Sequence, residues 1–134
     1  MAGRKPSILA IDDEENFTDM LKQYFSIRDY DIDVVSDGTR GIEAFRSKKY
    51  DVVLLDLKMV GINGDEVMKR MKEIDKDVKA VFITAFPDSG KTKGRLMELG
   101  AYAYLEKPLN SLKVLENIVN SALKDRNGKG GEDA

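Results

Sequence analysis

Short apolar runs alternate along this chain with segments in which apolar residues recur every three or four positions. The runs have the length of strands and are rich in β-branched or aromatic residues, and the first, third and fourth are almost continuously apolar. Continuous apolar runs are typical of parallel strands that are covered on both faces. The pattern therefore predicts five strands of a parallel sheet, at residues 8–11, 32–35, 52–55, 78–83 and 101–105.

A segment with helical periodicity follows each run. The first helix is expected at about residues 14–27, with one apolar face made of Phe17, Met20, Leu21, Tyr24 and Phe25. The second begins behind a predicted Asp37 N-cap and the fifth behind Asn110 or Ser111. The second, third and fourth helices are expected at about residues 37–48, 64–74 and 91–99.

Five strand–helix repeats predict an α/β fold, because alternating strands and helices join through right-handed crossovers into one parallel sheet. We expect a doubly wound sandwich with helices on both faces of that sheet. A chain of 134 residues has room for one such domain, which we assign to residues 7–124. Residues 1–6 are expected to be a flexible leader, and residues 125–134, with three Gly, a flexible tail.

Composition excludes several classes of function. Lys and Arg number 22 and Asp and Glu number 24, and this net charge of −2 does not favour direct binding of nucleic acid. The chain has no Cys and no His, which excludes disulfides, thiol nucleophiles and triads built on imidazole. The apolar runs are far shorter than the roughly 20 residues of a membrane span, so we expect a cytoplasmic protein with no membrane partner.

Acidic, hydroxyl and basic side chains come directly after these runs. The residues that follow the first, third, fourth and fifth runs are, in that order, Asp12 with Asp13, Asp56, Thr84 and Lys107. Because the carboxyl ends of parallel strands meet at one edge of a sheet, these side chains are expected in one cleft. Each alone would more often be a helix cap or a surface charge. Together, however, the carboxylates repel, by roughly 1 kcal/mol in water and roughly 4 kcal/mol at an effective dielectric constant of 20.

A hard divalent cation fits this cluster, because Lys107 supplies only one positive charge. Mg²⁺ prefers oxygen ligands and commonly takes one or two carboxylates, waters and the phosphate oxygens of a substrate. An ionised Asp can attack phosphorus and form an aspartyl phosphate, and phosphoryl transfer asks the protein mainly for positioning and charge neutralisation. Asp56, at the end of the central apolar run, is the best candidate nucleophile.

The chain resembles the receiver domain of two-component response regulators, of the chemotaxis-regulator kind, over about residues 7–124. The resemblance rests on Asp12-Asp13, Asp56, Thr84-Ala85 and Lys107-Pro108. It implies a flavodoxin-like (βα)5 sandwich with strand order 2-1-3-4-5. It also implies a phosphorylated signalling domain, not a turnover enzyme, in which Asp56 accepts a phosphoryl group. The donor would be a phosphohistidine of a sensor histidine kinase or phosphotransfer protein, and that partner would supply the histidine that this chain lacks.

The resemblance also assigns metal ligands. Asp13 and Asp56 would hold Mg²⁺, or Mn²⁺ in its place, directly. The backbone carbonyl of Lys58 would be a further ligand, and Asp12 would act through water.

The same resemblance implies a switch. Lys107 and Thr84 would contact the phosphoryl group, and Thr84 would move toward it. Tyr104 would then rotate inward and alter the face made by the fourth helix, the fifth strand and the fifth helix. The alternative for Tyr104 is a ring packed on the sheet edge with its hydroxyl in water. The resemblance implies a cis Lys107-Pro108 bond, whereas the sequence by itself favours the trans form.

One position departs from the family pattern, and two others stand where the family tunes the lifetime of the phosphoryl group. Met59 is followed by Val60, where the family usually has Pro, so the loop after Asp56 is expected to be less rigid. Lys58 and Phe86 stand where family members tune the lifetime of the phosphoryl group. Neither is a carboxylate or an amide that readily orients a water molecule, so we expect slow self-dephosphorylation.

Two other classes of protein remain as alternatives. One is a Mg²⁺-dependent phosphatase or phosphotransferase with an Asp nucleophile, like haloacid dehalogenases, but these usually have an acid where Lys58 stands. The other is a flavodoxin-like redox carrier, but acids follow the first run and would repel a flavin phosphate. For a receiver, the output would be a downstream protein or a fused effector domain. Many receivers pair through the fourth-helix to fifth-helix face, so a phosphorylation-dependent homodimer also stays open.

Overall fold

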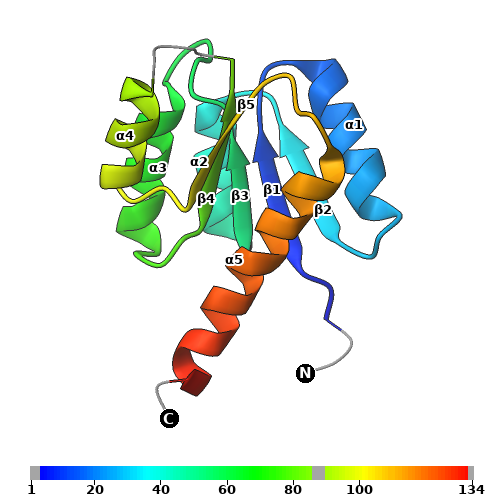
Figure 1. Cartoon of the computed structure of the whole chain (residues 1–134). Helices are drawn as coiled ribbons and strands as arrows, with labels where there is room; N and C mark the ends of the chain where they lie inside the picture. The colour runs from blue at the N-terminus through cyan, green and yellow to red at the C-terminus, as the bar shows by residue number, and fades with distance from the viewer. Residues whose placement is uncertain (1–3, 86–89, 133–134) are drawn as a thin grey trace.

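Strands and helices alternate along the chain, as the apolar pattern predicts (Figure 1). The structure is a computed structural model that describes residues 4–85 and 90–132, with side chains described as far as Asp125. The strands are β1 (Ser7–Ile11), β2 (Asp31–Val35), β3 (Val52–Leu55), β4 (Ala80–Thr84) and β5 (Ala103–Glu106). The helices are α1 (Glu15–Ser26), α2 (Gly38–Ser47), α3 (Gly64–Ile74), α4 (Lys91–Glu98) and α5 (Leu112–Glu132).

The strands form one parallel sheet in the order β2-β1-β3-β4-β5, which confirms the predicted fold class. Strand order reverses between β1 and β3, the place where ligands bind in sheets of this kind. Pairing aligns the last residues of neighbouring strands, Ile11 with Val35 and Leu55, and Thr84 with Glu106. The residues that follow the strands therefore meet at one edge of the sheet.

Helices cover both faces of the sheet, with α1 and α5 on one side and α2, α3 and α4 on the other (Figure 1). Because side chains alternate along a strand, β1 contributes to both cores. Ile8 and Ala10 pack in the core under α1 and α5, and Leu9 and Ile11 pack in the core under the other three helices. All four are at most 1% exposed, so β1 reads as a continuous apolar run.

Two predicted helix caps have the expected contacts. The Asp37 carboxylate accepts a hydrogen bond from the Arg40 backbone N–H at 2.8 Å, one turn into α2. Ser111 Oγ accepts from the Lys113 backbone N–H at 3.1 Å. Ser111, and not Asn110, is therefore the residue that caps α5.

The structure departs from the predicted apolar face of α1. The residues of α1 that are buried are Thr18, Leu21 and Phe25, whereas the Met20 side chain is 40% exposed. Met20 lies one position away from the stripe that Leu21 and Phe25 form at a spacing of four residues, so it falls at the margin of the helix–sheet contact.

The structure describes parts of the segments that were expected to be a leader and a tail. Arg4, assigned to the leader, donates from Nη2 to both carboxylate oxygens of Asp51 at 3.0 and 3.1 Å. The backbone of α5 continues through Glu132, within the segment expected to be a tail. Figure 1 shows α5 running on past the sheet. None of the helices in the described part of the chain is both long and apolar enough to cross a membrane.

Glu116 of α5 links that helix to the end of α1. Its carboxylate accepts hydrogen bonds from the hydroxyl groups of Tyr24 at 2.8 Å and Tyr30 at 3.3 Å, and Arg28 lies 3.7 Å away. The hydrogen bond from Tyr24, with smaller contributions from Lys113 and the other neighbours, lowers the pKa of Glu116 below its ordinary value. The ionised carboxylate therefore helps to hold α1 and α5 together on their face of the sheet.

Replacing Glu116 by Gln should lower the free energy of unfolding at neutral pH by about 1 kcal/mol, because hydrogen bonds to a charged acceptor are lost. The carboxylate has a lower pKa in the folded state than its ordinary 4.5, so its contribution is complete above that value. The contribution is lost as the pH falls through the folded-state pKa. Urea unfolding of both proteins at several pH values would measure this, and a difference that does not shrink in acid would contradict it.

Candidate functional site

Two aspartates extend the central strands by one residue at the edge where the carboxyl ends meet. The Asp12 backbone N–H donates to the Val35 carbonyl at 3.2 Å, and the Asp56 backbone N–H donates to the Ile11 carbonyl at 3.0 Å. The ladder thus continues past β1 and β3 and fixes the direction of both side chains. Asp12 is 4% exposed and Asp56 is 7% exposed.

A third carboxylate completes the predicted acidic cluster. Asp13 is exposed, and each of Asp12, Asp13 and Asp56 offers an oxygen within 4.8 Å of the others. Three carboxylate oxygens at this spacing are a hard donor set of the kind that Mg²⁺ takes. Burial raises the pKa of Asp12, against the hydrogen bond from Lys107 that lowers it. The fold therefore brings together the three predicted carboxylates in an arrangement that could hold a metal ion.

Lys107 contacts this cluster from the end of β5. Its Nζ lies 2.9 Å from Asp12 Oδ2, 2.9 Å from Glu14 Oε1 and 3.6 Å from Asp56 Oδ2. Burial would lower the pKa of Lys107, but its hydrogen bonds to Asp12 and Glu14 outweigh that effect and raise it. The side chain is therefore an ammonium ion whose charge offsets part of the charge of the carboxylates.

The backbone around Lys107 is held by the neighbouring strand. Its N–H donates to the Thr84 carbonyl at 3.0 Å, which extends the pairing of β4 with β5. The Lys107-Pro108 bond is cis, as the resemblance implies and contrary to the trans form that the sequence by itself favours. Thr84 is 1% exposed at the end of β4. Thr84 thus lies at the same edge of the sheet as the other predicted residues.

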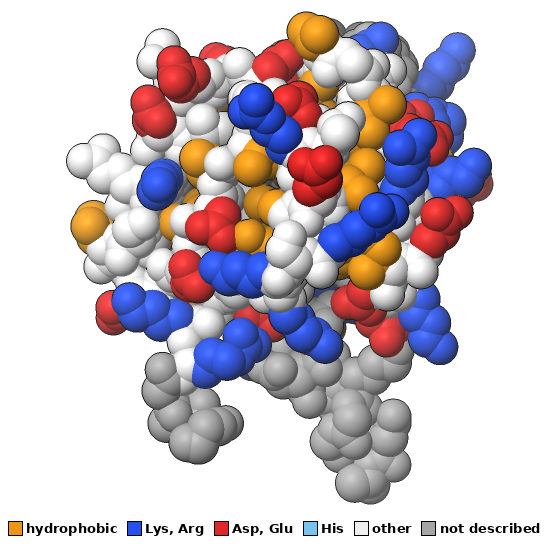
Figure 2. All heavy atoms as spheres, turned by 180° about the vertical axis from the view of Figure 1, so that it is seen from behind, with side chains coloured by type: hydrophobic (Ala, Val, Ile, Leu, Met, Phe, Trp, Pro, Cys, Tyr) orange, Lys and Arg blue, Asp and Glu red, His pale blue; other side chains and the backbone are white. Residues whose placement is uncertain are grey.

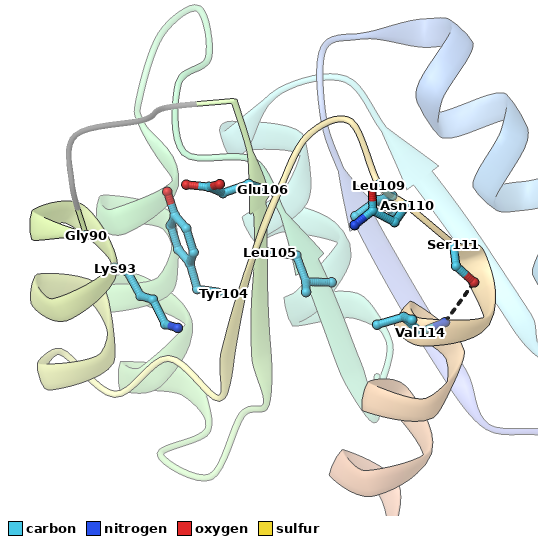
Figure 3. A pocket seen from close by; sticks show the side chains of 9 residues that line it. All are labelled: Gly90, Lys93, Tyr104, Leu105, Glu106, Leu109, Asn110, Ser111 and Val114. Atoms are coloured by element: carbon cyan, nitrogen blue, oxygen red, sulfur yellow. Dashed lines mark hydrogen bonds between the residues drawn. The ribbon is translucent and has the colours of Figure 1, made fainter.

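Tyr104 lies in β5 on the side of the sheet that faces α4. It is half-buried and packs against the core beneath α2, α3 and α4. Figure 3 shows its ring between β5 and α4, with the hydroxyl directed toward Glu106, while Leu105 points the other way. Tyr104 and Val114 contribute to the lining of a cavity of about 460 Å³ between α4, β5 and α5. The predicted switch residue therefore lines a surface cavity whose lining contains none of Asp12, Asp13 and Asp56.

The loop between β3 and α3 is held by a contact that the sequence did not reveal. The Asn63 side-chain oxygen accepts a hydrogen bond from the Met59 backbone N–H at 3.3 Å, and Gly61 has a φ of 89°. Val60, in the place of the usual Pro, is 82% exposed. Lys58 is exposed in this loop, and Phe86 lies outside the described residues.

Two residues near the site were not among the predicted site residues. Glu14 directly follows the aspartate pair, and the same argument about strand ends could have included it. Gly64 begins α3, where a Cβ atom would lie 2.2 Å from the Asp56 carbonyl oxygen. Its N–H donates to the Leu57 carbonyl at 2.8 Å. Only the close approach of two backbones shows that Gly64 helps to place Asp56.

A family comparison agrees with this fold. The model of the response regulator receiver domain matches residues 8–119. The chain therefore belongs to the response regulator receiver domains, which are signalling domains of two-component systems.

Individual relatives are similar over most of this chain. The uncharacterised transcriptional regulatory protein YkoG of Bacillus subtilis is 32% identical over 96% of the chain, but the chain spans only 55% of its length. The chemotaxis protein CheY of Treponema pallidum is 32% identical, with 89% of this chain and 88% of CheY covered. A crystal structure of the response regulator TrrA of Thermotoga maritima, in complex with Mg²⁺ and BeF, has a TM-score of 0.78 and 32% identity. That match covers 88% of this chain and 99% of TrrA.

Replacing Gly64 by Ala should lower the free energy of unfolding by roughly 1–3 kcal/mol, because the methyl group overlaps the backbone of Asp56. It should also weaken Mg²⁺ binding, measured by a titration followed by NMR, since Asp56 must shift. Gly94 in α4 provides the control, because a Cβ atom there would meet nothing within 4 Å. Gly94→Ala should stabilise the protein by roughly 0.5–1 kcal/mol. Equal stability of the two variants would contradict the role of Gly64.

Proposed function

We propose that this domain accepts a phosphoryl group on Asp56, in the presence of Mg²⁺, from a phosphohistidine of a sensor kinase or phosphotransfer protein. One observation carries the proposal: Asp56 lies at the sheet edge within a cluster of three carboxylates, with the Lys107 ammonium 3.6 Å from its Oδ2. Phosphoryl transfer needs a nucleophile together with positioned positive charge. In this cluster Asp56 is the nucleophile, and Lys107 and a bound metal ion would supply the positive charge.

The reaction would exchange one bond to phosphorus for another. An Asp56 carboxylate oxygen forms the new O–P bond, and the P–N bond to the donor imidazole breaks. The leaving nitrogen keeps the electron pair of that bond. Mg²⁺, when bound, would neutralise charge on the phosphoryl oxygens. The domain promotes its own phosphorylation and the later hydrolysis of the aspartyl phosphate, and it does not turn over a separate substrate.

The residues of this chain have separate tasks in the proposed reaction. Asp13 and Asp56 would hold the metal ion directly, with the Lys58 carbonyl, and Asp12 would act through water. Lys107 and Thr84 contact the phosphoryl group. Support comes from the spacing of the three carboxylates and from the TrrA structure, which contains Mg²⁺ and BeF.

The proposed response to phosphorylation is a change at the face made by α4, β5 and α5. Thr84 moves toward the phosphoryl group, and Tyr104 turns inward as a two-state element. This proposal is supported by the position of Tyr104 between β5 and α4, at the wall of the cavity of about 460 Å³ (Figure 3). A downstream protein, an effector domain or a second copy of the domain would read the altered face.

The charges of the surface bear on the choice of partner. Figure 2 shows Lys, Arg, Asp and Glu side chains interspersed over the rear face of the molecule. Mixed charge of this kind, with a net charge of −2 for the whole chain, favours protein partners over direct contact with nucleic acid.

Incubation with Mg²⁺ and acetyl phosphate would test the proposed function. The protein should gain one phosphoryl group, detected by intact mass, that hydroxylamine removes. Asp56→Asn should abolish the gain, because an amide is not a nucleophile toward phosphorus, and omission of Mg²⁺ should slow it strongly. Modification that persists in Asp56→Asn, or sustained release of phosphate over many turnovers, would overturn the proposal in favour of a different chemistry.

The residues at the two lifetime positions support slow loss of the phosphoryl group. Lys58 is exposed, and neither its ammonium nor the phenyl ring of Phe86 can accept a proton from an attacking water. We therefore expect the phosphorylated protein to persist well beyond seconds.

Replacing Phe86 by Glu should shorten that lifetime, because a carboxylate can orient and activate water. Phosphorylated protein separated from the donor would be followed by intact mass at intervals. Phe86→Leu provides the control, since it removes the ring without adding a carboxylate. A lifetime of seconds in the unaltered protein, or equal decay in the Glu and Leu variants, would contradict the expectation.

A further inference from the structure

The Lys107 ammonium is not shared equally among its three acidic neighbours. Its Nζ lies 2.9 Å from Asp12 Oδ2 and 2.9 Å from Glu14 Oε1, which are the distances of charge-assisted hydrogen bonds. Its distance from Asp56 Oδ2 is 3.6 Å, beyond the range of a hydrogen bond. Lys107 is therefore held most closely by the two residues beside α1, and less closely by the proposed phosphoacceptor.

Residues at the start of α1 form a fixed binding position for this ammonium. The Glu14 carbonyl accepts hydrogen bonds from the backbone N–H groups of Phe17 and Thr18, and the Glu14 N–H donates to Asp12 Oδ1 at 2.9 Å. The backbone of Glu14 is thereby fixed, although its side chain is 60% exposed. The Phe17 ring faces the same ammonium, with its centroid 4.6 Å from Nζ, which adds a cation–π contact.

We infer that Glu14 is a positioning residue that draws Lys107 toward α1 in the unphosphorylated domain and competes with the phosphoryl group on Asp56 for the ammonium. This inference rests on the proposed function. Phosphorylation would place new negative charge on Asp56, so Lys107 would exchange one of its two short contacts for a phosphoryl oxygen. The contact to Glu14 is the one exchanged, because Glu14 is far more exposed to water than Asp12 and holds Lys107 more weakly.

The affinity of a Glu14 variant for a phosphoryl analogue would test this competition. The probe is beryllofluoride with saturating Mg²⁺, and its binding is followed by NMR of the backbone amides. Glu14→Gln keeps the length of the side chain and removes its charge, so it should bind the probe about two- to fivefold more tightly, the range of an exposed ion pair. Damage to the fold would instead weaken binding.

Two further variants separate the contact from general electrostatics. Glu15→Gln removes the same charge one residue away, in the first turn of α1, from a side chain that makes no ion pair or hydrogen bond with Lys107 among the described residues. Glu14→Asp keeps the charge but shortens the side chain by one methylene. Tighter binding in both Glu14 variants, with Glu15→Gln unchanged, is the expected result.

Other outcomes would overturn the inference. Equal tightening in Glu14→Gln and Glu15→Gln, with Glu14→Asp unchanged, would assign the effect to net charge alone. Unchanged or weaker binding in Glu14→Gln would contradict the competition for Lys107. Failure of the unaltered protein both to bind beryllofluoride and to be phosphorylated by acetyl phosphate would instead contradict the proposed function, and the inference with it.

Discussion

Repulsion between buried carboxylates is the constraint on which the site depends. Parallel pairing brings the ends of β1 and β3 side by side, so Asp12 and Asp56 are both nearly buried at one edge. Like charges this close are unfavourable in a medium of low dielectric constant unless a cation lies among them. Lys107 meets part of that need, and the remaining negative charge suits a divalent metal ion. With a metal ion bound, this edge would carry the positive charge that the proposed phosphoryl transfer needs.

The parts of the site are placed by close packing and strand pairing. Asp56 is placed by the backbone of Gly64, Lys107 by the pairing of β5 with β4, and Thr84 by the same pair of strands. Tyr104 packs against the core that contains Leu96 of α4. The residues that place the site therefore belong to a densely packed interior, in which a change of even one methylene is felt.

Much of the architecture was predictable, and the reasons differ from element to element. The continuous apolar runs of β1, β3 and β4 mark them as buried strands, and Asp37 marks the start of α2 because its side chain can satisfy a free N–H. The order of the strands came from the family resemblance, because periodicity says nothing about which strands are neighbours. Met20 was misplaced because an apolar residue at the margin of a helical stripe has the same local pattern as a buried one.

The sequence by itself determined the alternation of strands and helices and the residues that would follow each strand, because both depend on local periodicity and chain order. It therefore placed Asp12, Asp13, Asp56, Thr84 and Lys107 at one edge. Only the tertiary structure decided that Glu14 and Asp12 share the Lys107 ammonium and that Gly64 approaches the backbone of Asp56. Glu14 and Lys107 are 93 residues apart, and contacts at such separations arise from packing between elements, which leaves no periodic signal along the chain.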